Sequence, residues 1–387
     1  MQPLSNQEAE RIVRAGAAAL QQGRPDAARA EFEKVAASGR ASAQVWLLLA
    51  HACREGGDTA AAEAALDRLL AGEPQNLWGL IQKGDARAAA GDGRAATAFY
   101  KKARQVAAGV GELPPDYARE MERVERAIGE AEAHYKAHLE EALAARGFGP
   151  GARSPRFQQS LAILAGEKPI YYQQPTNYFF PELPHIQFFD RAAFPWAAAV
   201  EAATADIRAE IIALMDDKGA FQPYLVAAPN RPRTDFHGLA DNPEWSSLYL
   251  WENGAPVAEN VARCPKAYEA LLQAPMPHIS TRAPVVMFSR LAPGARIPAH
   301  TGMLNARLIC HLPLIVPPGC GFRVGNEVRE WEEGKLLIFD DTIEHEAWND
   351  SREDRVILIF DIWRPELSDG ERAAVAAMFE SVDSYGG

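Results

Sequence analysis

Apolar residues follow two different patterns along the chain, and the first covers about a hundred residues. There, small and bulky apolar residues recur at helical spacing with a period of 34. The recurring positions are Gly16, Ala50 and Gly84; Ala28, Ala62 and Ala96; Phe32, Leu66 and Tyr100; and the glycines Gly23, Gly57 and Gly91. This pattern predicts pairs of helices joined by glycine turns. The small residue would let the two helices of a pair approach, and the bulky residue would fill the gap against the next repeat.

The period and its small and bulky positions resemble tetratricopeptide repeats, of which about three are present. An ordinary bundle of alanine-rich helices is the alternative. Residues 116–146 predict one or two further charged helices that cap the repeats. Glycine and proline then crowd residues 147–155, which indicates a boundary between domains at 1–148 and 156–387.

The second pattern, after residue 156, is typical of short strands. Prolines and aromatic residues over 156–190 predict extended chain that wraps the second domain, and residues 192–216 predict an amphipathic helix. Strands are expected at 285–291, 307–316, 321–324, 335–339 and 356–363, a strand into a turn at 245–254, and a closing helix at 369–382. Short strands between Gly/Pro turns favour an antiparallel sandwich or barrel. The predicted fold class is therefore a multidomain α + β protein, with an all-α solenoid ahead of a β domain with flanking helices.

Charge and cysteine usage narrow the range of partners and compartments. The formal net charge is −12, and most of the acidic excess falls after residue 150, which argues against nucleic acid as a partner. The four cysteines show no paired ligand spacing and no disulfide framework, so we expect a reduced, cytoplasmic compartment. The first residues do not read as a secretory signal, and no run of eighteen apolar residues occurs, so no membrane partner is expected.

Histidines at the ends of predicted strands are the candidate chemistry. His300 follows a Pro-Gly turn, and His345 lies 45 residues later at the end of a strand. Imidazole suits Fe(II), Zn or Cu, and histidines from two strands can converge on one metal. In the common non-haem iron site a carboxylate lies two residues after the first histidine, but here that position is Gly302. For each histidine alone, a structural role is the competing interpretation.

The motif with glycine in that place resembles the aspartyl/asparaginyl β-hydroxylase family. The likeness covers most of 156–387 and is dense over 284–367. Its residues are Phe288-Ser289, Pro293-Gly294, His300-Thr301-Gly302, Arg307, His311-Leu312, Trp331-Glu332-Glu333-Gly334, Phe339-Asp340-Asp341, His345-Glu346, Trp348, Arg355 and Asp361-Ile362-Trp363. The resemblance implies a double-stranded β-helix (jelly-roll or cupin-like) oxygenase that uses Fe(II), 2-oxoglutarate and O2. Some members of the family also carry amino-terminal tetratricopeptide repeats.

The resemblance also implies roles for individual residues. His300 and His345 would be the iron ligands. Arg355 would clamp the distal carboxylate of 2-oxoglutarate with help from Ser289, and His311 would bind the other carboxylate as a donor.

Arg307 lies on the same strand face as His311, so we expect it to meet an anionic group, the substrate carboxylate, with a surface or ion-pair role as the alternative. Animal members carry a second arginine where this chain has Ile309, which bears on the substrate. Asp340 and Asp341 are expected as turn residues, with orientation of His345 or of an iron-bound water as the alternative.

Three functions follow from these residues. The first is a 2-oxoglutarate-dependent dioxygenase that hydroxylates an Asp/Asn-type side chain of a peptide or protein, recruited by the concave surface of the repeats. The second keeps the chemistry but acts on a free amino acid, a nonribosomal peptide or a lipid. The third is a repeat-based adaptor whose barrel is catalytically silent. The sequence disfavours the third, because every position implied for iron and cosubstrate is present.

Overall fold

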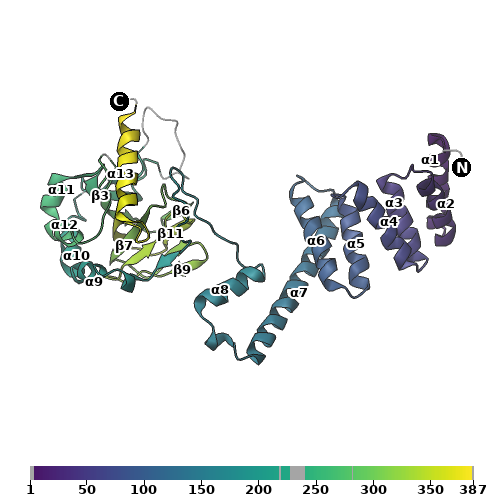
Figure 1. The fold of residues 1–387 in the computed structure, drawn as a ribbon, viewed down its shortest axis with the longest axis horizontal. Coiled ribbons are helices and arrows are strands. Elements are labelled where there is room, and N and C mark those ends of the chain that lie inside the picture. The colour runs from purple at the N-terminus through teal and green to yellow at the C-terminus, as the bar shows by residue number, and fades with distance from the viewer. Residues whose placement is uncertain (1–3, 218, 227–239, 281, 386–387) are drawn as a thin grey trace. The chain divides into compact units, whose positions relative to one another are not determined.

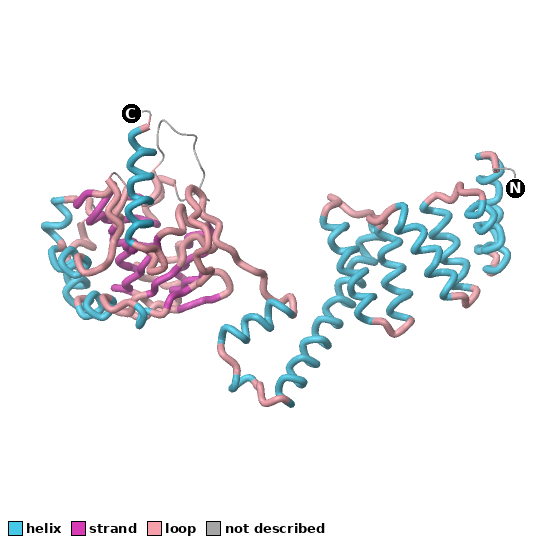
Figure 2. Tube along the Cα trace, viewed as in Figure 1, coloured by secondary structure: helices cyan, strands magenta, loops and turns pink. Residues whose placement is uncertain are grey.

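The computed structural model describes residues 4–217, 219–226, 240–280 and 282–385. The chain divides into two compact units, Met1–Glu167 and Lys168–Gly387 (Figure 1). The first unit is helical, and the second contains all the strands of the described residues (Figure 2).

The first unit is a series of helix pairs. Its helices are α1 (Asn6–Gln21), α2 (Pro25–Ala37), α3 (Ala43–Glu55), α4 (Thr59–Gly72), α5 (Leu77–Ala89), α6 (Gly93–Ala108), α7 (Pro115–Ala145), the 3-10 turn η1 (Pro150–Ala152) and α8 (Pro155–Leu164). The three turn glycines Gly23, Gly57 and Gly91 all have positive φ, between 67° and 83°, which glycine adopts without strain. The period of 34 therefore marks three helical hairpins, and the predicted capping segment is the single helix α7.

Packing within each hairpin brings the small and the bulky residue together. A Cβ added to Gly16 would lie 2.6 Å from the Phe32 ring, and one added to Gly84 would overlap the Tyr100 ring. Both rings are buried. Each ring also shares a core with the helix that follows its hairpin, Phe32 with α3 and Tyr100 with α7, so the bulky residue contacts the next repeat as predicted.

Replacing Gly84 by alanine should destabilise the helical unit by about 1–3 kcal/mol, because the new methyl group must displace the Tyr100 ring from a filled core. Gly129, in α7, has nothing within 4 Å of an added Cβ, so Gly129→Ala should leave stability unchanged or raise it by up to about 1 kcal/mol. Urea unfolding followed by far-UV circular dichroism compares the two variants. Equal stability of Gly84→Ala and the parent chain would contradict the close packing.

The segment after α7 is helical over part of the range for which the sequence predicted extended chain. Residues 155–164, expected to be extended, form α8. Arg153 pairs with Glu140 at 2.6 Å, and Lys136 pairs with Glu167 at 2.6 Å, so these ion pairs hold the segment after α7 to α7 itself. The limits 1–148 and 156–387 stay a prediction. The contacts group residues up to Glu167 with the helices.

The second unit is built on two antiparallel sheets. The larger has the order β1-β10-β7-β12-β5-β3-β2, with β4 paired to β3, and the smaller has the order β6-β11-β8-β9. The strands are β1 (Phe188–Phe189), β2 (Gln222–Pro223), β3 (Trp245–Glu252), β4 (Ala255–Pro256), β5 (Val286–Leu291), β6 (Arg296–His300), β7 (Arg307–Ile315), β8 (Cys320–Val324), β9 (Glu327–Arg329), β10 (Leu337–Phe339), β11 (His345–Asn349) and β12 (Arg355–Trp363). The β-rich domain expected after the repeats is thus confirmed.

Helices cover one face of the larger sheet. They are η2 (Arg191–Ala193), α9 (Ala197–Ala202), α10 (Thr204–Ile212), α11 (Ala258–Arg263) and α12 (Pro265–Leu271). The closing helix α13 (Asp369–Ser384) packs elsewhere, in a smaller core with Leu183 and Ile279. Apolar side chains of α9, α10 and α12 form one core with alternate residues of the sheet, among them Phe288, Cys310 and Leu358. The other face of the same strands turns toward the smaller sheet and shares a second core with Ile297 and Ala347. As predicted, Cys310 faces the apolar layer, away from His311.

The amphipathic helix predicted for 192–216 is interrupted. It forms α9 and α10, which meet at Ala203. The Thr204 hydroxyl donates to the Glu201 carbonyl at 2.6 Å, and such local side-chain bonds compete with the helix ladder. The apolar side was predicted correctly, because Val200, Ile207 and Ile211 are fully buried.

Candidate active site

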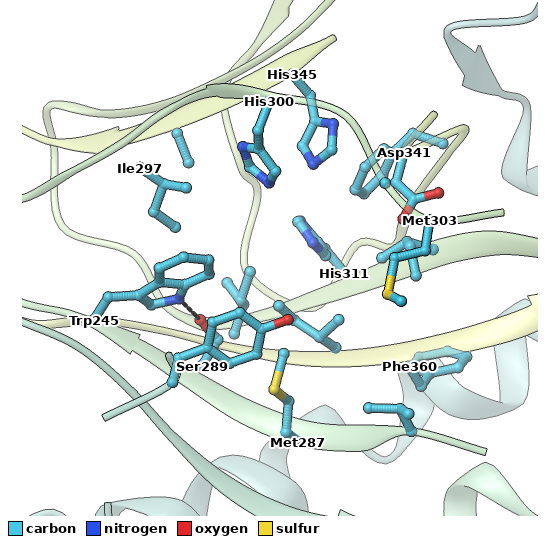
Figure 3. A pocket seen from close by; sticks show the side chains of 18 of the residues that line it. Trp245, Met287, Ser289, Ile297, His300, Met303, His311, Asp341, His345 and Phe360 are labelled. Atoms are coloured by element: carbon cyan, nitrogen blue, oxygen red, sulfur yellow. Dashed lines mark hydrogen bonds between the residues drawn. The ribbon is translucent and has the colours of Figure 1, made fainter. Parts of the chain in front are cut away.

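A cavity of about 610 Å³ lies between the two sheets (Figure 3). All six candidate residues from the sequence line it: Ser289, His300, Arg307, His311, His345 and Arg355. They come from five strands of both sheets, and only His311 and Arg307 share a strand. The fold therefore brings together residues that lie up to 66 positions apart.

His300 and His345 face each other across neighbouring strands. They are directly paired in the register of β6 and β11, with ring centroids 4.1 Å apart (Figure 3). The Nδ1 atom of His300 donates to the Pro298 carbonyl at 2.8 Å, and that of His345 donates to the Ile343 carbonyl at 3.0 Å. These bonds fix the tautomer, so that Nε2 of each ring keeps a lone pair for another partner.

Burial keeps both rings neutral. It lowers the pKa of His300, and it lowers the pKa of His345 to about 3, with the neighbouring His300 as a further cause. A neutral imidazole with a free Nε2 is the form that coordinates a metal. Among residues 4–217, 219–226, 240–280 and 282–385, no group of three or more His, Cys, Asp or Glu side chains is placed to hold a metal. Any metal here would take two ligands from these residues.

Arg355 is a buried cation with unused donors. It is 1% exposed, and neither its Nε nor its Nη2 has a partner among the described residues. The guanidinium carbon lies 5.0 Å from the centroid of the Trp331 ring. Burial lowers its pKa to about 10, so the group is still charged at neutral pH. An unpaired buried charge is costly, and this arrangement therefore suits an anionic ligand.

Ser289 and His311 lie close to that cation. Ser289 is on β5, diagonal to Arg355 on β12, and its Oγ accepts a hydrogen bond from Trp245 Nε1 at 3.3 Å (Figure 3). The serine proton therefore remains available for a ligand. His311 is buried, and its Nδ1 has no partner in the described part of the chain. Burial and the charge of Arg355 hold the pKa of His311 well below its usual range.

Arg307 is committed to carboxylates of the protein itself. Its Nη1 donates to Asp361 at 3.0 Å, and its Nη2 donates to Asp341 at 3.4 Å. Its Nε has no partner among the described residues. The sequence predicted an anionic partner for Arg307 in a substrate, but it did not predict either aspartate, because the pairs join residues 54 and 34 positions apart.

Gly302 is required by the position of Asp341. A Cβ added to Gly302 would overlap both carboxylate oxygens of Asp341, and the Gly302 amide donates to the Asp341 carbonyl at 2.7 Å. The loop after His300 and the loop before His345 are thus packed against each other. Burial raises the pKa of Asp341 to about 6. Asp341, considered mainly as a turn residue, lines the cavity, whereas Asp340 caps its turn by accepting from the Thr342 amide and hydroxyl.

An extended segment, residues 171–180, bonds to the loop after His300 and to the loop before His345, and we call it the strap. The Gln174 amide donates to the Thr342 carbonyl at 2.7 Å, and the Thr176 amide donates to the Gly302 carbonyl at 3.0 Å. Gln173, which is buried, donates to the Asp340 carboxylate at 2.6 Å. Sequence reasoning predicted wrapping chain here but missed this role of Gln173, for which an isolated glutamine gives no signal.

Three further histidines occur in loops, His185, His237 and His278, and those that the structure describes lie outside the cavity. His185 accepts from the Gln173 amide at 3.2 Å and does not line the cavity, and neither does the exposed His278. His237 lies outside the described residues. In the part of the chain that the structure describes, no helix combines the length and apolar character needed to cross a bilayer.

Comparison with known proteins follows this division into two units. Residues 201–365 match the family described as Aspartyl/Asparaginyl beta-hydroxylase, and residues 19–84 match the tetratricopeptide repeat. The ornithine lipid ester-linked acyl 2-hydroxylase of Rhizobium tropici is 33% identical over 199 residues, which are 51% of this chain and 67% of that protein. The aspartyl/asparaginyl beta-hydroxylase of Mus musculus is 37% identical over 174 residues, which are 44% of this chain.

The chain covers only part of these relatives, and just 22% of the mouse protein. The crystal structure of PcrH from Pseudomonas aeruginosa is similar to the helical part, with a TM-score of 0.30, 18% identity, and coverage of 33% of this chain and 94% of that chain. The sequence matches show that the chain belongs to the aspartyl/asparaginyl beta-hydroxylase family and carries tetratricopeptide repeats ahead of that family's domain.

Proposed function

We propose that this protein is a hydroxylase that uses Fe(II), 2-oxoglutarate and O2. The observation that carries the proposal is Arg355, a buried cation with two donor atoms that have no partner among the described residues. It lines the same cavity as two neutral histidines whose Nδ1 atoms donate to the main chain, which leaves their Nε2 atoms unprotonated. A small dicarboxylate could bind Arg355 with one carboxylate and, with the other, a metal held by the two histidines.

The residues of the cavity fit these groups. His300 and His345 would hold iron through Nε2. Arg355 and the Ser289 hydroxyl would hold the distal carboxylate of 2-oxoglutarate, and His311 would donate to the carboxylate nearer the metal. When bound, iron and 2-oxoglutarate would supply the oxidising power to insert one oxygen atom of O2 into a C–H bond, with release of succinate and CO2.

The chain itself would orient these groups and exclude water. The main-chain bonds to both Nδ1 atoms hold the two rings in position, and Trp331 and Phe322 stack beside the cosubstrate end with rings 5.4 Å apart. Two antiparallel sheets with this cavity between them are the arrangement expected of a double-stranded β-helix, and we propose that fold for the second unit.

The substrate has two candidate classes. The name of the mouse relative suggests an Asp/Asn-type side chain of a peptide or protein, which the concave surface of the repeats would recruit. The name of the Rhizobium relative suggests a lipid acyl chain, and the apolar Ile309 in the cavity favours this second class. A cytoplasmic location stays a prediction.

Succinate release tests the proposal directly. The full chain with Fe(II), 2-oxoglutarate and O2 should release succinate, at least slowly in the absence of substrate, and should bind 2-oxoglutarate only when a metal such as Mn(II) is present. A chain with neither property would be a silent adaptor instead.

Replacing Arg355 by alanine should raise the KM for 2-oxoglutarate about a hundredfold, because a paired guanidinium–carboxylate contact in a buried site is worth about 3 kcal/mol. The measurement is succinate release against 2-oxoglutarate concentration. Arg290→Ala is the matched control, since Arg290 pairs with Asp354 and does not line the cavity. An unchanged KM in Arg355→Ala would remove this residue from the cosubstrate site.

A further inference from the structure

The two proposed metal ligands lie where their strand ladder is irregular. His300 is the last residue of β6 and His345 is the first residue of β11, and the two are paired. The next pair joins Ala347 to Ile297, which is one residue out of register, so a bulge separates the histidine pair from the rest of the ladder. Because a bulge disrupts the hydrogen bonds of a ladder, the strands alone hold the two rings less firmly than a regular ladder would. The adjoining loops must contribute.

One buried side chain, Gln173 of the strap, joins those two loops. Its Nε2 donates to Asp340 Oδ2 at 2.6 Å, and its Oε1 accepts from Asn305 Nδ2 at 3.0 Å. Asn305 lies five residues after His300, and Asp340 lies five residues before His345. Gln173 is 6% exposed, and Asn305 and Asp340 are fully buried. Gln173 therefore bridges corresponding points on the loops of both proposed ligands.

Each group that the Gln173 side chain contacts also has a second hydrogen-bond partner. Besides Asn305 and Asp340, Gln173 contacts the Pro184 carbonyl at 3.1 Å. The second contacts run from Arg364 to Asp340 at 2.7 Å, from Arg364 to the Pro184 carbonyl at 2.8 Å, and from Asn305 to the Phe180 carbonyl at 2.9 Å. Removal of the Gln173 side-chain amide would leave none of these groups without a partner, so its cost in stability should be small. It would remove the link between the two loops.

We propose that Gln173 is a positioning residue for the metal site: by joining Asn305 to Asp340, it fixes how His300 and His345 present their Nε2 atoms to one metal ion. The proposal rests on the proposed function, because it takes these two histidines as the ligands. With only two ligands from the protein, no third side chain defines the geometry, so the orientation of the rings depends on the hydrogen bonds around them. Gln173 does not line the cavity and would act through the loops. A buried polar network whose members are all paired selects one arrangement of the chain.

Gln173→Met tests the proposal, because methionine has a similar length and volume but cannot join the two loops. In the full chain, the affinity for Mn(II), followed by the electron paramagnetic resonance of the free ion, should fall about tenfold. The spectrum of the bound ion should change as well, since it reports the arrangement of the ligands. Parent-like affinity together with a parent-like spectrum of the bound ion overturns the proposal.

Two control variants separate positioning from a general loss of stability. Gln222→Met also removes a hydrogen bond from a glutamine, to the Gly219 carbonyl, and Gln222 does not line the cavity. Ile207→Val removes a methyl group from the core on the other face of the larger sheet, and its loss of stability in urea should be comparable to that of Gln173→Met. Both controls should bind Mn(II) as the parent chain does. If Ile207→Val weakens Mn(II) binding as much as Gln173→Met, Gln173 supports only the fold and the proposal is wrong.

Hydrogen exchange in the metal-free chain distinguishes a failure of this inference from a failure of the proposed function. The Gly302 amide donates to the Asp341 carbonyl, and the Thr342 amide donates to Asp340 Oδ1, so these two amides report on the two loops. Their exchange should rise several-fold in Gln173→Met and stay unchanged in Gln222→Met. If the exchange rises but the parent chain binds no Mn(II), the proposed function fails while the link between the loops stands. If the parent chain binds Mn(II) and Gln173→Met changes neither affinity nor exchange, the inference fails while the proposed function stands.

Discussion

Replacing His345 by alanine should lower the affinity for Mn(II) or Fe(II) by more than about a hundredfold and abolish succinate release. Loss of a residue that merely supports a metal ligand commonly costs ten- to a hundredfold in affinity, and here one of two proposed protein ligands would disappear. The His300 ring, 4.1 Å away, would remain as a single ligand. Titration of Mn(II), followed by the electron paramagnetic resonance of the free ion, measures the change.

His278→Ala is the matched control for that experiment, because His278 is exposed and lies outside the cavity. It should bind Mn(II) as the parent chain does. Far-UV circular dichroism checks that both variants fold. Parent-like Mn(II) affinity in His345→Ala would place the metal elsewhere and remove the basis of the proposed function.

Replacing Gly302 by alanine should destabilise the second unit by about 1–3 kcal/mol and strongly reduce metal binding. The added methyl group would occupy the place of the Asp341 carboxylate, which also pairs with Arg307. Gly302→Asp should fail in the same way. Although it restores the carboxylate position of the common iron site, it sets two carboxylates in one space, where like charges repel.

Second substitutions at Asp341 show whether the loss of stability in Gly302→Ala comes from the volume or from the charge of the Asp341 side chain. Gly302→Ala combined with Asp341→Ala should recover part of the lost stability, because the space is vacated. Gly302→Ala combined with Asp341→Asn should not, because asparagine has the same shape. Urea unfolding of the single and double variants gives the coupling energy. Additive losses in both double variants would mean that Gly302 and Asp341 do not compete for space.

The sequence predicted the larger sheet far better than the smaller one. Strands β5, β7 and β12 bury both faces, so they appear as apolar runs. Strands β6 and β11 were missed as strands, because His300 and His345 occupy positions that an apolar pattern would need. The strands that carry the proposed ligands are thus the ones that sequence patterns predict least well, because the polar histidines interrupt the apolar pattern.

The sequence predicted which candidate residues share the site, but it did not predict which other side chains they contact. The resemblance pointed to six residues that share one cavity, and the parity of Arg307 and His311 on β7 is confirmed. Asp361 could not be assigned to Arg307, because the contact depends on how β12 pairs with β7. Local pattern carries no information about such register, and register decides which charged side chains of β7 and β12 meet.

The strap ties the segment that precedes β1 to the two loops next to His300 and His345. Its first residue follows the end of the helical unit at Glu167 by four positions, and its amides hold the loops next to His300 and His345. A chain that began at β1 would retain all twelve strands of the described residues and still lose these bonds. Exchange of the repeats between relatives by recombination would therefore preserve the support of both loops only if the crossover lay before residue 171.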